Sequence, residues 1–254
     1  VTYKDDAQTQ AFCAGPLKDV WASCEEPSTS PHDATSRRIM ALGDSFTDGV
    51  GVFAKDTWPS QLERELGENY RVTNCGKASS FTSHVAKRFL KYRKTHDPEI
   101  AVYAYVLNDV PLKGAESPDG RDIAFQLPNR RAYTQGVADT LFGPLSDYSA
   151  LARLISERAA QGQVATDTRR FYEESYSSSN EEAFIEAMDL IAAMRDLIEE
   201  DNGRFIVVIW PLLEELGNYP FEAIHAKVSS ALEQRQVAHL DLLDLFSGQD
   251  ENRL

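Results

Sequence analysis

The feature that most constrains the fold is a regular alternation of short strand-like segments with segments whose apolar residues recur at helical spacing. The strand-like segments cover residues 38–42, 71–74, 100–107, 205–210 and 239–243. Between them, residues 58–66, 83–92, 181–200 and 220–234 carry apolar side chains at the spacing of amphipathic helices. This pattern is typical of a parallel sheet covered by helices on both faces. Right-handed crossovers then predict an α/β protein, a three-layer α/β/α sandwich around a five-stranded parallel sheet.

The alternation does not cover the whole chain of 254 residues. Residues 1–36 are polar and rich in turn formers, so we expect an N-terminal extension that packs on a main domain over residues 37–254. Within that domain, the section at about 110–180 is a long insertion, with an irregular polar part at 110–129 and a helical pattern at 148–160. Connections of this length are usually functional, and this one is expected to form a lid over a site.

Charge and composition limit the classes of partner and cofactor that we expect for this chain. The formal net charge is −14, and a field of that sign repels phosphate backbones, so nucleic acid is not an expected partner. No stretch approaches the roughly 18 consecutive apolar residues of a membrane span. No cluster of histidine, cysteine and carboxylate residues has ligand spacing, so neither a metal nor a cofactor is expected. The oligomeric state is not decided by the sequence.

The three cysteines bear on the compartment. Cys75 lies beside a polar turn and is interpreted as a small buried thiol. Cys13 and Cys24 lie in the N-terminal extension, where a disulfide between them would indicate an oxidising compartment, secreted or periplasmic. The alternative is two unrelated thiols, which leaves a cytoplasmic location open.

Polar turns follow three of the expected strands. They cover residues 43–49, 74–79 and 108–109. In an open parallel sheet, ligands bind beyond the carboxyl ends of the strands, so these turns are expected to converge on one site.

Ser45 is the candidate nucleophile in the first turn. A serine between a strand and a helix presents its hydroxyl at the sheet edge, and its own N–H can stabilise the oxyanion formed by attack on a carbonyl. Gly43 permits the sharp turn, and Asp44 can form hydrogen bonds across it. The alternative is that Ser45 only caps a helix.

The heptad Gly-Asp-Ser-Phe-Thr-Asp-Gly at residues 43–49 resembles the first block of the GDSL/SGNH hydrolases. Residues 74–79, Asn-Cys-Gly-Lys-Ala-Ser, resemble the second block, Asn-x-Gly-x-x-Gly, with Ser79 where the family has a glycine. Residues 106–109, Val-Leu-Asn-Asp, resemble the third block, Gly-x-Asn-Asp, in which the asparagine is kept as Asn108. The resemblance implies a flavodoxin-like SGNH hydrolase fold and an oxyanion hole formed by the N–H groups of Ser45 and Ser79 and the side chain of Asn108. Asp44, Asp109 and His84 are the residues expected to contact the substrate.

The same resemblance implies a general base from an Asp-x-x-His motif after the last strand. The sequence holds no such motif, and of its five histidines only His84 is expected near Ser45. We therefore expect the base to follow residue 254. The leading hypothesis is a serine hydrolase of a small-molecule ester, an acyl or acetyl ester, with carbohydrate and lipid esters as the candidate substrates. The alternative is a binding module that keeps the fold and lacks the base.

Overall fold

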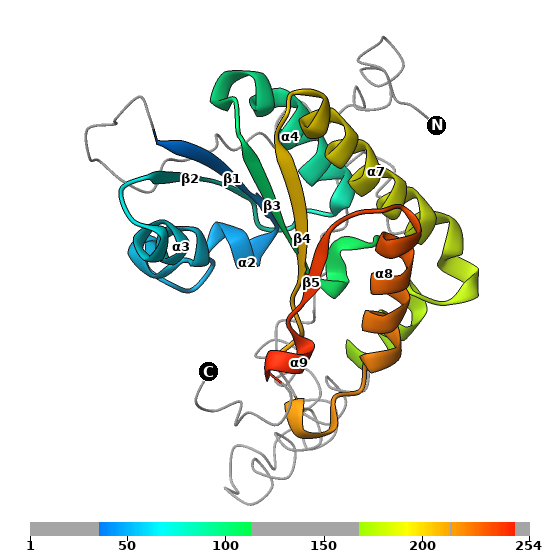
Figure 1. The fold of residues 1–254 in the computed structure, drawn as a ribbon. Coiled ribbons are helices and arrows are strands. Elements are labelled where there is room, and N and C mark those ends of the chain that lie inside the picture. Colours follow the sequence, from blue (N-terminus) through cyan, green and yellow to red (C-terminus); the bar gives the residue numbers. More distant parts are fainter. Residues whose placement is uncertain (1–35, 113–167, 214, 247–254) are drawn as a thin grey trace, which may run out of the picture.

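The computed structural model describes residues 36–112, 168–213 and 215–246. Its sheet has five strands, all parallel, in the order β2-β1-β3-β4-β5, as expected for a flavodoxin-like fold (Figure 1). The strands are β1 (Arg37–Gly43), β2 (Tyr70–Gly76), β3 (Ile100–Tyr105), β4 (Arg204–Ile209) and β5 (His239–Asp241). The fold class predicted from the sequence is confirmed. The N-terminal extension and the helical pattern at 148–160 lie outside the described residues.

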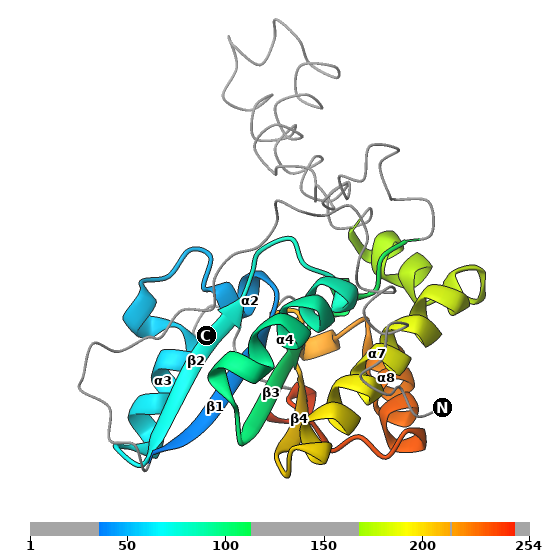
Figure 2. The ribbon, with the colours of Figure 1, turned by 90° about the horizontal axis from the view of Figure 1, so that it is seen from above.

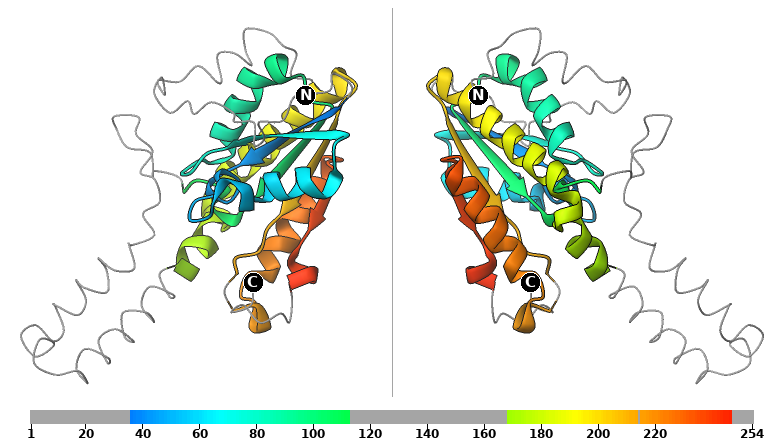
Figure 3. Two further views of the ribbon diagram at one scale, coloured as in Figure 1. Left: turned by 90° about the vertical axis from the view of Figure 1, so that its left-hand side faces the viewer. Right: turned by 90° about the vertical axis from the view of Figure 1, so that its right-hand side faces the viewer.

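Helices cover both faces of this sheet. One face carries α4 (Thr82–His96), α7 (Glu181–Glu200) and α8 (Glu222–Gln234), and the other carries α3 (Trp58–Leu66). Opposite views show α3 in front of the sheet in one case and α7 and α8 in the other (Figure 3). The remaining elements are short: α2 (Ser45–Asp48), α9 (Leu243–Phe246), η1 (Ala54–Asp56), η2 (Leu107–Asp109), η3 (Ser178–Asn180) and η4 (Leu216–Asn218). None of the described helices combines the length and apolar character needed to cross a membrane.

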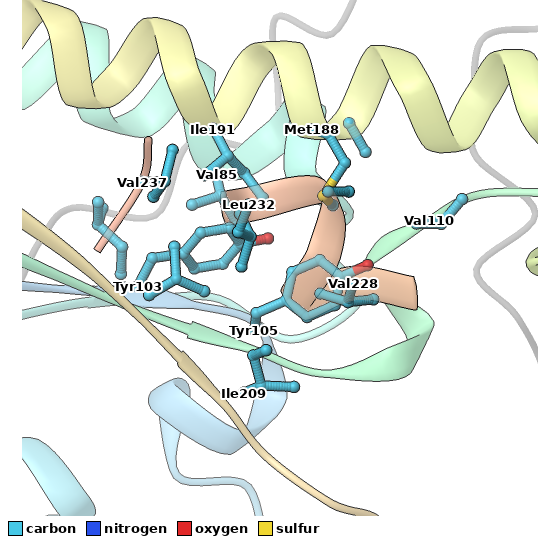
Figure 4. Packing of buried hydrophobic residues seen from close by; sticks show 14 of the residues in the cluster. Val85, Tyr103, Tyr105, Val110, Met188, Ile191, Ile209, Val228, Leu232 and Val237 are labelled. Carbon is cyan, nitrogen blue, oxygen red and sulfur yellow. The ribbon is translucent and has the colours of Figure 1, made fainter. Parts of the chain in front are cut away.

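The larger core lies between the sheet and the helices α4, α7 and α8, where α4 and α7 run side by side (Figure 2). Tyr103 and Tyr105 of β3 are completely buried and point toward Met188 of α7 and Val228 of α8 (Figure 4). Burying a large apolar side chain contributes about 1.5–3 kcal/mol, so this layer dominates the stability of the domain. The smaller core lies under α3 and is built on the buried residues Ile39, Ala41 and Val72.

Hydrogen bonds in the larger core also hold the segment that follows β3. The hydroxyl groups of Tyr105 and Tyr176 are 2.6 Å apart, and Tyr176 donates to the carbonyl oxygen of Leu107 at 3.0 Å. Leu107 is the first residue of η2, which carries Asn108. The core therefore fixes the position of one of the polar turns.

Strand register brings the turns together. Gly43, the last residue of β1, pairs with Gly76 at the end of β2 and with Ala104 near the end of β3. The convergence of the three turns on one edge, expected from the sequence, is confirmed.

Three strands end earlier than the sequence predicted: β4 stops at Ile209, one residue before the expected end, and β3 and β5 stop two residues early. We expected the third strand to reach residue 107, but β3 ends at Tyr105 and η2 follows, because the N–H of Val106 donates to Oδ2 of Asp109. We expected the fifth strand to reach residue 243, but β5 ends at Asp241, whose carboxylate accepts the N–H of Leu243. In both cases a carboxylate captures a backbone donor and starts a turn.

Candidate active site

The first turn of the site depends on close packing at Gly43. A Cβ at this position would lie 2.2 Å from Oγ1 of Thr47 and 3.0 Å from the carbonyl oxygen of Ala104. Thr47 is fully buried, and its hydroxyl donates to Leu42 at 3.3 Å and accepts from the indole of Trp58 at 3.2 Å. These neighbouring atoms are held in place, so a side chain at residue 43 would collide with them. The sharp turn into α2 therefore requires a glycine at this position.

The carboxylate of Asp44 connects the other residues of the site. Asp44 precedes α2 and is completely buried, and its Oδ1 accepts the N–H of Phe46 at 3.0 Å. Its Oδ2 accepts from Oγ of Ser45 at 3.3 Å and from Nδ2 of Asn108 at 2.8 Å. The hydroxyl of Ser45 and the amide of Asn108 therefore meet at one oxygen atom, although 62 residues separate them in the sequence.

The side chains of Ser45 and Asn108 can each form a further hydrogen bond with a ligand. Both side chains are partly exposed. The hydrogen bond from Ser45 to Asp44, at 3.3 Å, is long for two oxygen atoms and therefore weak. The amide of Asn108 has two N–H bonds, of which the contact with Asp44 uses one.

Hydrogen bonds between side chains and backbone groups join the second turn to the first. Nδ2 of Asn74 donates to the carbonyl oxygen of Thr47 at 2.8 Å, and Oδ2 of Asp48 accepts the N–H of Ala78 at 2.8 Å. Gly76 lies so close to α2 that a Cβ there would be 2.3 Å from the backbone nitrogen of Asp48. The two turns therefore form one packed unit.

Ser79 stands where the family motif has a glycine, and its backbone takes a glycine-like conformation. Its φ is 60°, in the left-handed region, and the residue is exposed. A non-glycine residue there costs about 1–2 kcal/mol, and such strain is found where the surrounding structure enforces it. The loop conformation that would present the Ser79 N–H is thus adopted with a serine side chain.

Asp109, predicted to contact substrate, has no exposed surface. Its Oδ2 accepts the N–H of Val106 at 2.9 Å, while no hydrogen bond of standard geometry joins Oδ1 to a described residue. Burial, reinforced by the charge of Asp44, raises the pKa of Asp109 well above its ordinary value. Asp44 is equally buried, so the structure gives both carboxyl groups contacts inside the protein and exposes neither to a substrate.

His84 is also committed to a local contact. It lies in the first turn of α4, is 7% exposed, and its Nδ1 accepts the N–H of Phe81 at 3.0 Å. The imidazole stacks on the ring of Phe81, with 5.8 Å between the centroids. This arrangement caps the helix, and it does not support the predicted contact with substrate.

A second histidine, His225, carries a contact that the sequence analysis missed. It is almost fully buried, and its Nδ1 lies 2.9 Å from Oδ1 of Asp241, while its Nε2 lies 3.1 Å from the hydroxyl of Tyr219. The Tyr219 hydroxyl accepts the N–H of Leu212 at 3.0 Å. The signal was available: a carboxylate that ends a strand and a histidine that opens the preceding helix lie at the same edge of the sheet.

Arg88 is the other side chain that the sequence analysis missed. It is 2% exposed, and its guanidinium donates to the carbonyl oxygens of Gly43 and Cys75 and to the hydroxyl of Ser80. Burial lowers the pKa of Arg88 from its ordinary value. Its place on α4 between the buried residues Val85 and Phe89 was the available signal that it faces the sheet.

The interpretation of Cys75 as a free thiol is wrong, since Cys75 is disulfide-bonded. Its partner lies outside the described residues. The predicted pairing of Cys13 with Cys24 lies outside the described residues. In the described ranges, no three histidine, cysteine, aspartate or glutamate side chains gather as metal ligands would.

Fold and site together define a class: a flavodoxin-like α/β protein with a serine, an asparagine and a buried carboxylate joined at the carboxyl edge of its sheet.

Residues 41–254 match the sequence model of the GDSL-like lipase/acylhydrolase family, and the chain belongs to this family. Membership supports a hydrolase that acts on ester bonds. No curated protein matches the chain.

Among solved structures, the chain is similar to AlinE4, an SGNH-hydrolase family esterase, at 15% identity over 88% of this chain and 84% of that one, with a TM-score of 0.43. It is similar to TesA at 12% identity over 80% and 77%, with a TM-score of 0.42. A carbohydrate acetylesterase family member from Sinorhizobium meliloti shares 15% identity over 85% and 91%, with a TM-score of 0.38. The family assignment rests on the sequence match alone.

Proposed function

We propose that this protein is a carboxylic ester hydrolase in which Ser45 is the nucleophile. The observation that carries the proposal is the shared acceptor, since Oδ2 of Asp44 receives hydrogen bonds from both Ser45 and Asn108. A hydroxyl nucleophile with an amide donor beside it is what attack on an ester carbonyl requires. The proposed substrate is a small-molecule ester, either an acyl or an acetyl ester, on a carbohydrate or a lipid.

In the proposed reaction, Oγ of Ser45 attacks the ester carbonyl carbon, and the hydroxyl proton passes to a general base. The carbonyl electron pair moves to oxygen, where the N–H groups of Ser45 and Ser79 and the amide of Asn108 stabilise the charge. The intermediate collapses, and the alcohol leaves with the proton held by the base. A water molecule then attacks the acyl group on Ser45, which releases the carboxylic acid and restores the hydroxyl.

Within this mechanism we assign Asp44 a positioning role. It holds Asn108 by a 2.8 Å hydrogen bond, so the remaining amide N–H is oriented before a substrate arrives. Its contact with Ser45 is weaker, which lets the hydroxyl turn toward a base.

The general base is proposed to be a histidine that reaches the serine from outside the described residues. The ring of Phe246, at the end of α9, lies with its centroid 6.4 Å from that of Trp210, and Trp210 lies 6.5 Å from Phe46, the neighbour of Ser45. The segment after β5 therefore returns toward the serine. Residues 247–254 contain no histidine, so these residues do not supply the base.

Hydrolysis of p-nitrophenyl acetate by the full-length natural protein tests the proposed function. We expect Ser45→Ala to abolish turnover and Asn108→Ala to lower kcat by about a hundred- to a thousand-fold, the usual cost of one oxyanion donor. Ser230→Ala, an exposed serine of α8, is the matched control and should keep wild-type activity. Unchanged activity in Ser45→Ala would remove Ser45 from the mechanism. A folded wild-type protein that binds esters without cleaving them would favour the inactive binding module.

A further inference from the structure

Arg88 joins the two turns whose backbone N–H groups are the proposed oxyanion donors. Its Nη2 donates to the carbonyl oxygen of Gly43 at 2.8 Å, and its Nε donates to the carbonyl oxygen of Cys75 at 3.0 Å. Its Nη1 donates to the hydroxyl of Ser80 at 2.9 Å. Gly43 lies two residues before Ser45, and Ser80 directly follows Ser79. One rigid planar group therefore spans both turns.

Two of the Arg88 contacts, with Gly43 and Cys75, lie at the ends of the paired strands. Gly43 and Gly76 are the last paired residues of β1 and β2, so the ladder between these strands ends just before Ser45 and Ser79. A guanidinium group keeps its N–H bonds in a fixed plane, and fixing two carbonyl oxygens and a hydroxyl in that plane fixes the spacing between the turns. Asp48 adds a second link through the N–H of Ala78.

The charge of Arg88 also acts on the site. The hydrogen bonds above go to uncharged oxygen atoms, and the guanidinium also interacts electrostatically with Tyr103 and with the carboxyl groups of Asp109, Asp48 and Asp44. Asp44 lies directly beside the place where the oxyanion would form. A buried cation that interacts with these acidic groups offsets part of their repulsion of a developing negative charge.

We propose that Arg88 is a positioning residue for catalysis, which sets the distance between the Ser45 and Ser79 N–H groups and balances the negative charge of the site. This inference rests on the proposed ester hydrolysis. Arg93 supplies the matched comparison, because it is a buried arginine of the same helix, 7% exposed, whose guanidinium contacts Leu197 and Asp201 at the far end of α4. A generic structural role would make the two arginines behave alike.

The test compares Arg88→Ala, Arg88→Lys and Arg93→Ala in the full-length natural protein with p-nitrophenyl acetate. We expect both Arg88 variants to lose about a hundred-fold in kcat with little change in KM, since the loss falls on the transition state. Added guanidinium at millimolar concentration should restore part of the kcat of Arg88→Ala and none of that of Arg93→Ala, with sodium chloride as the salt control. Arg93→Ala should keep a kcat close to that of wild type even where its urea midpoint falls.

Several results would overturn the inference. These are equal kcat values for folded Arg88→Ala and Arg93→Ala, a fall in activity that follows only the folded fraction, or loss of folding in both Arg88 variants while Arg93→Ala folds. Failure of the proposed function is distinguishable, because wild-type protein would then show no hydrolysis that depends on Ser45.

Discussion

Asp44 joins Ser45 and Asn108, because its carboxylate accepts a hydrogen bond from each. Gly43 and Gly76 allow the turns around these residues to pack closely. The sequence motif predicted a serine, an asparagine and a glycine-rich turn at one edge, and their places are as expected. The motif did not predict how they are linked, because a shared acceptor depends on side-chain directions across 62 residues of chain. Likewise, the strain at Ser79 is a backbone property that the residue name does not reveal.

Gly76→Ala tests the close packing of the first two turns. The added methyl group would overlap backbone atoms of Thr47 and Asp48. Backbone atoms cannot move aside as the end of a flexible side chain can. We expect a loss of about 1–3 kcal/mol in the free energy of unfolding, measured by urea denaturation, together with a reduced kcat. Gly217→Ala is the control, because a Cβ there meets no atom within 4 Å. Equal stabilities of the two variants would show that the turns can separate without cost.

At the scale of elements, the order of strands and helices was predictable because hydrophobic periodicity is a local property. The bounds of α3 and α7 agree with those predicted, residues 58–66 and 181–200. Strand ends were harder, since Asp109 and Asp241 stop their strands through side-chain contacts that no periodicity records. The contacts of Arg88 and His225 escaped notice for a similar reason, because each joins a helix to the end of a strand.

The pair His225 and Asp241, which joins α8 to β5, gives a prediction about pH. Burial alone would raise the pKa of Asp241, but its hydrogen bonds with His225 and Leu243 and its electrostatic interaction with His225 outweigh burial and hold that pKa below the ordinary value. A carboxylate with a depressed pKa contributes stability above its unfolded-state pKa of about 3.9, and that stability is lost as the pH falls through the folded-state pKa.

We therefore expect Asp241→Asn to lower the free energy of unfolding by up to about 1 kcal/mol at pH 7, since the carboxylate is partly exposed. The difference from wild type should shrink below about pH 4. Urea denaturation at pH 7 and pH 3 measures both values. Asp244→Asn, at an exposed position of α9, is the control. A difference from wild type that stays constant between the two pH values would contradict the role given to the Asp241 charge.

At the scale of the whole molecule, a parallel sheet with strand order β2-β1-β3-β4-β5 brings polar turns from distant segments to one edge. Topology follows from the alternation of elements, so this arrangement was predictable. The disulfide at Cys75 was not, because the spacing of three cysteines in a sequence does not determine which of them pair.

The central claim is that Ser45 is the nucleophile of this domain. The most direct test is to label the full-length natural protein with a fluorophosphonate and to map the adduct by mass spectrometry of its peptides. The account predicts one adduct, on Ser45, which disappears in Ser45→Ala and remains in Ser230→Ala. An adduct on another residue, or labelling that persists in Ser45→Ala, would contradict it.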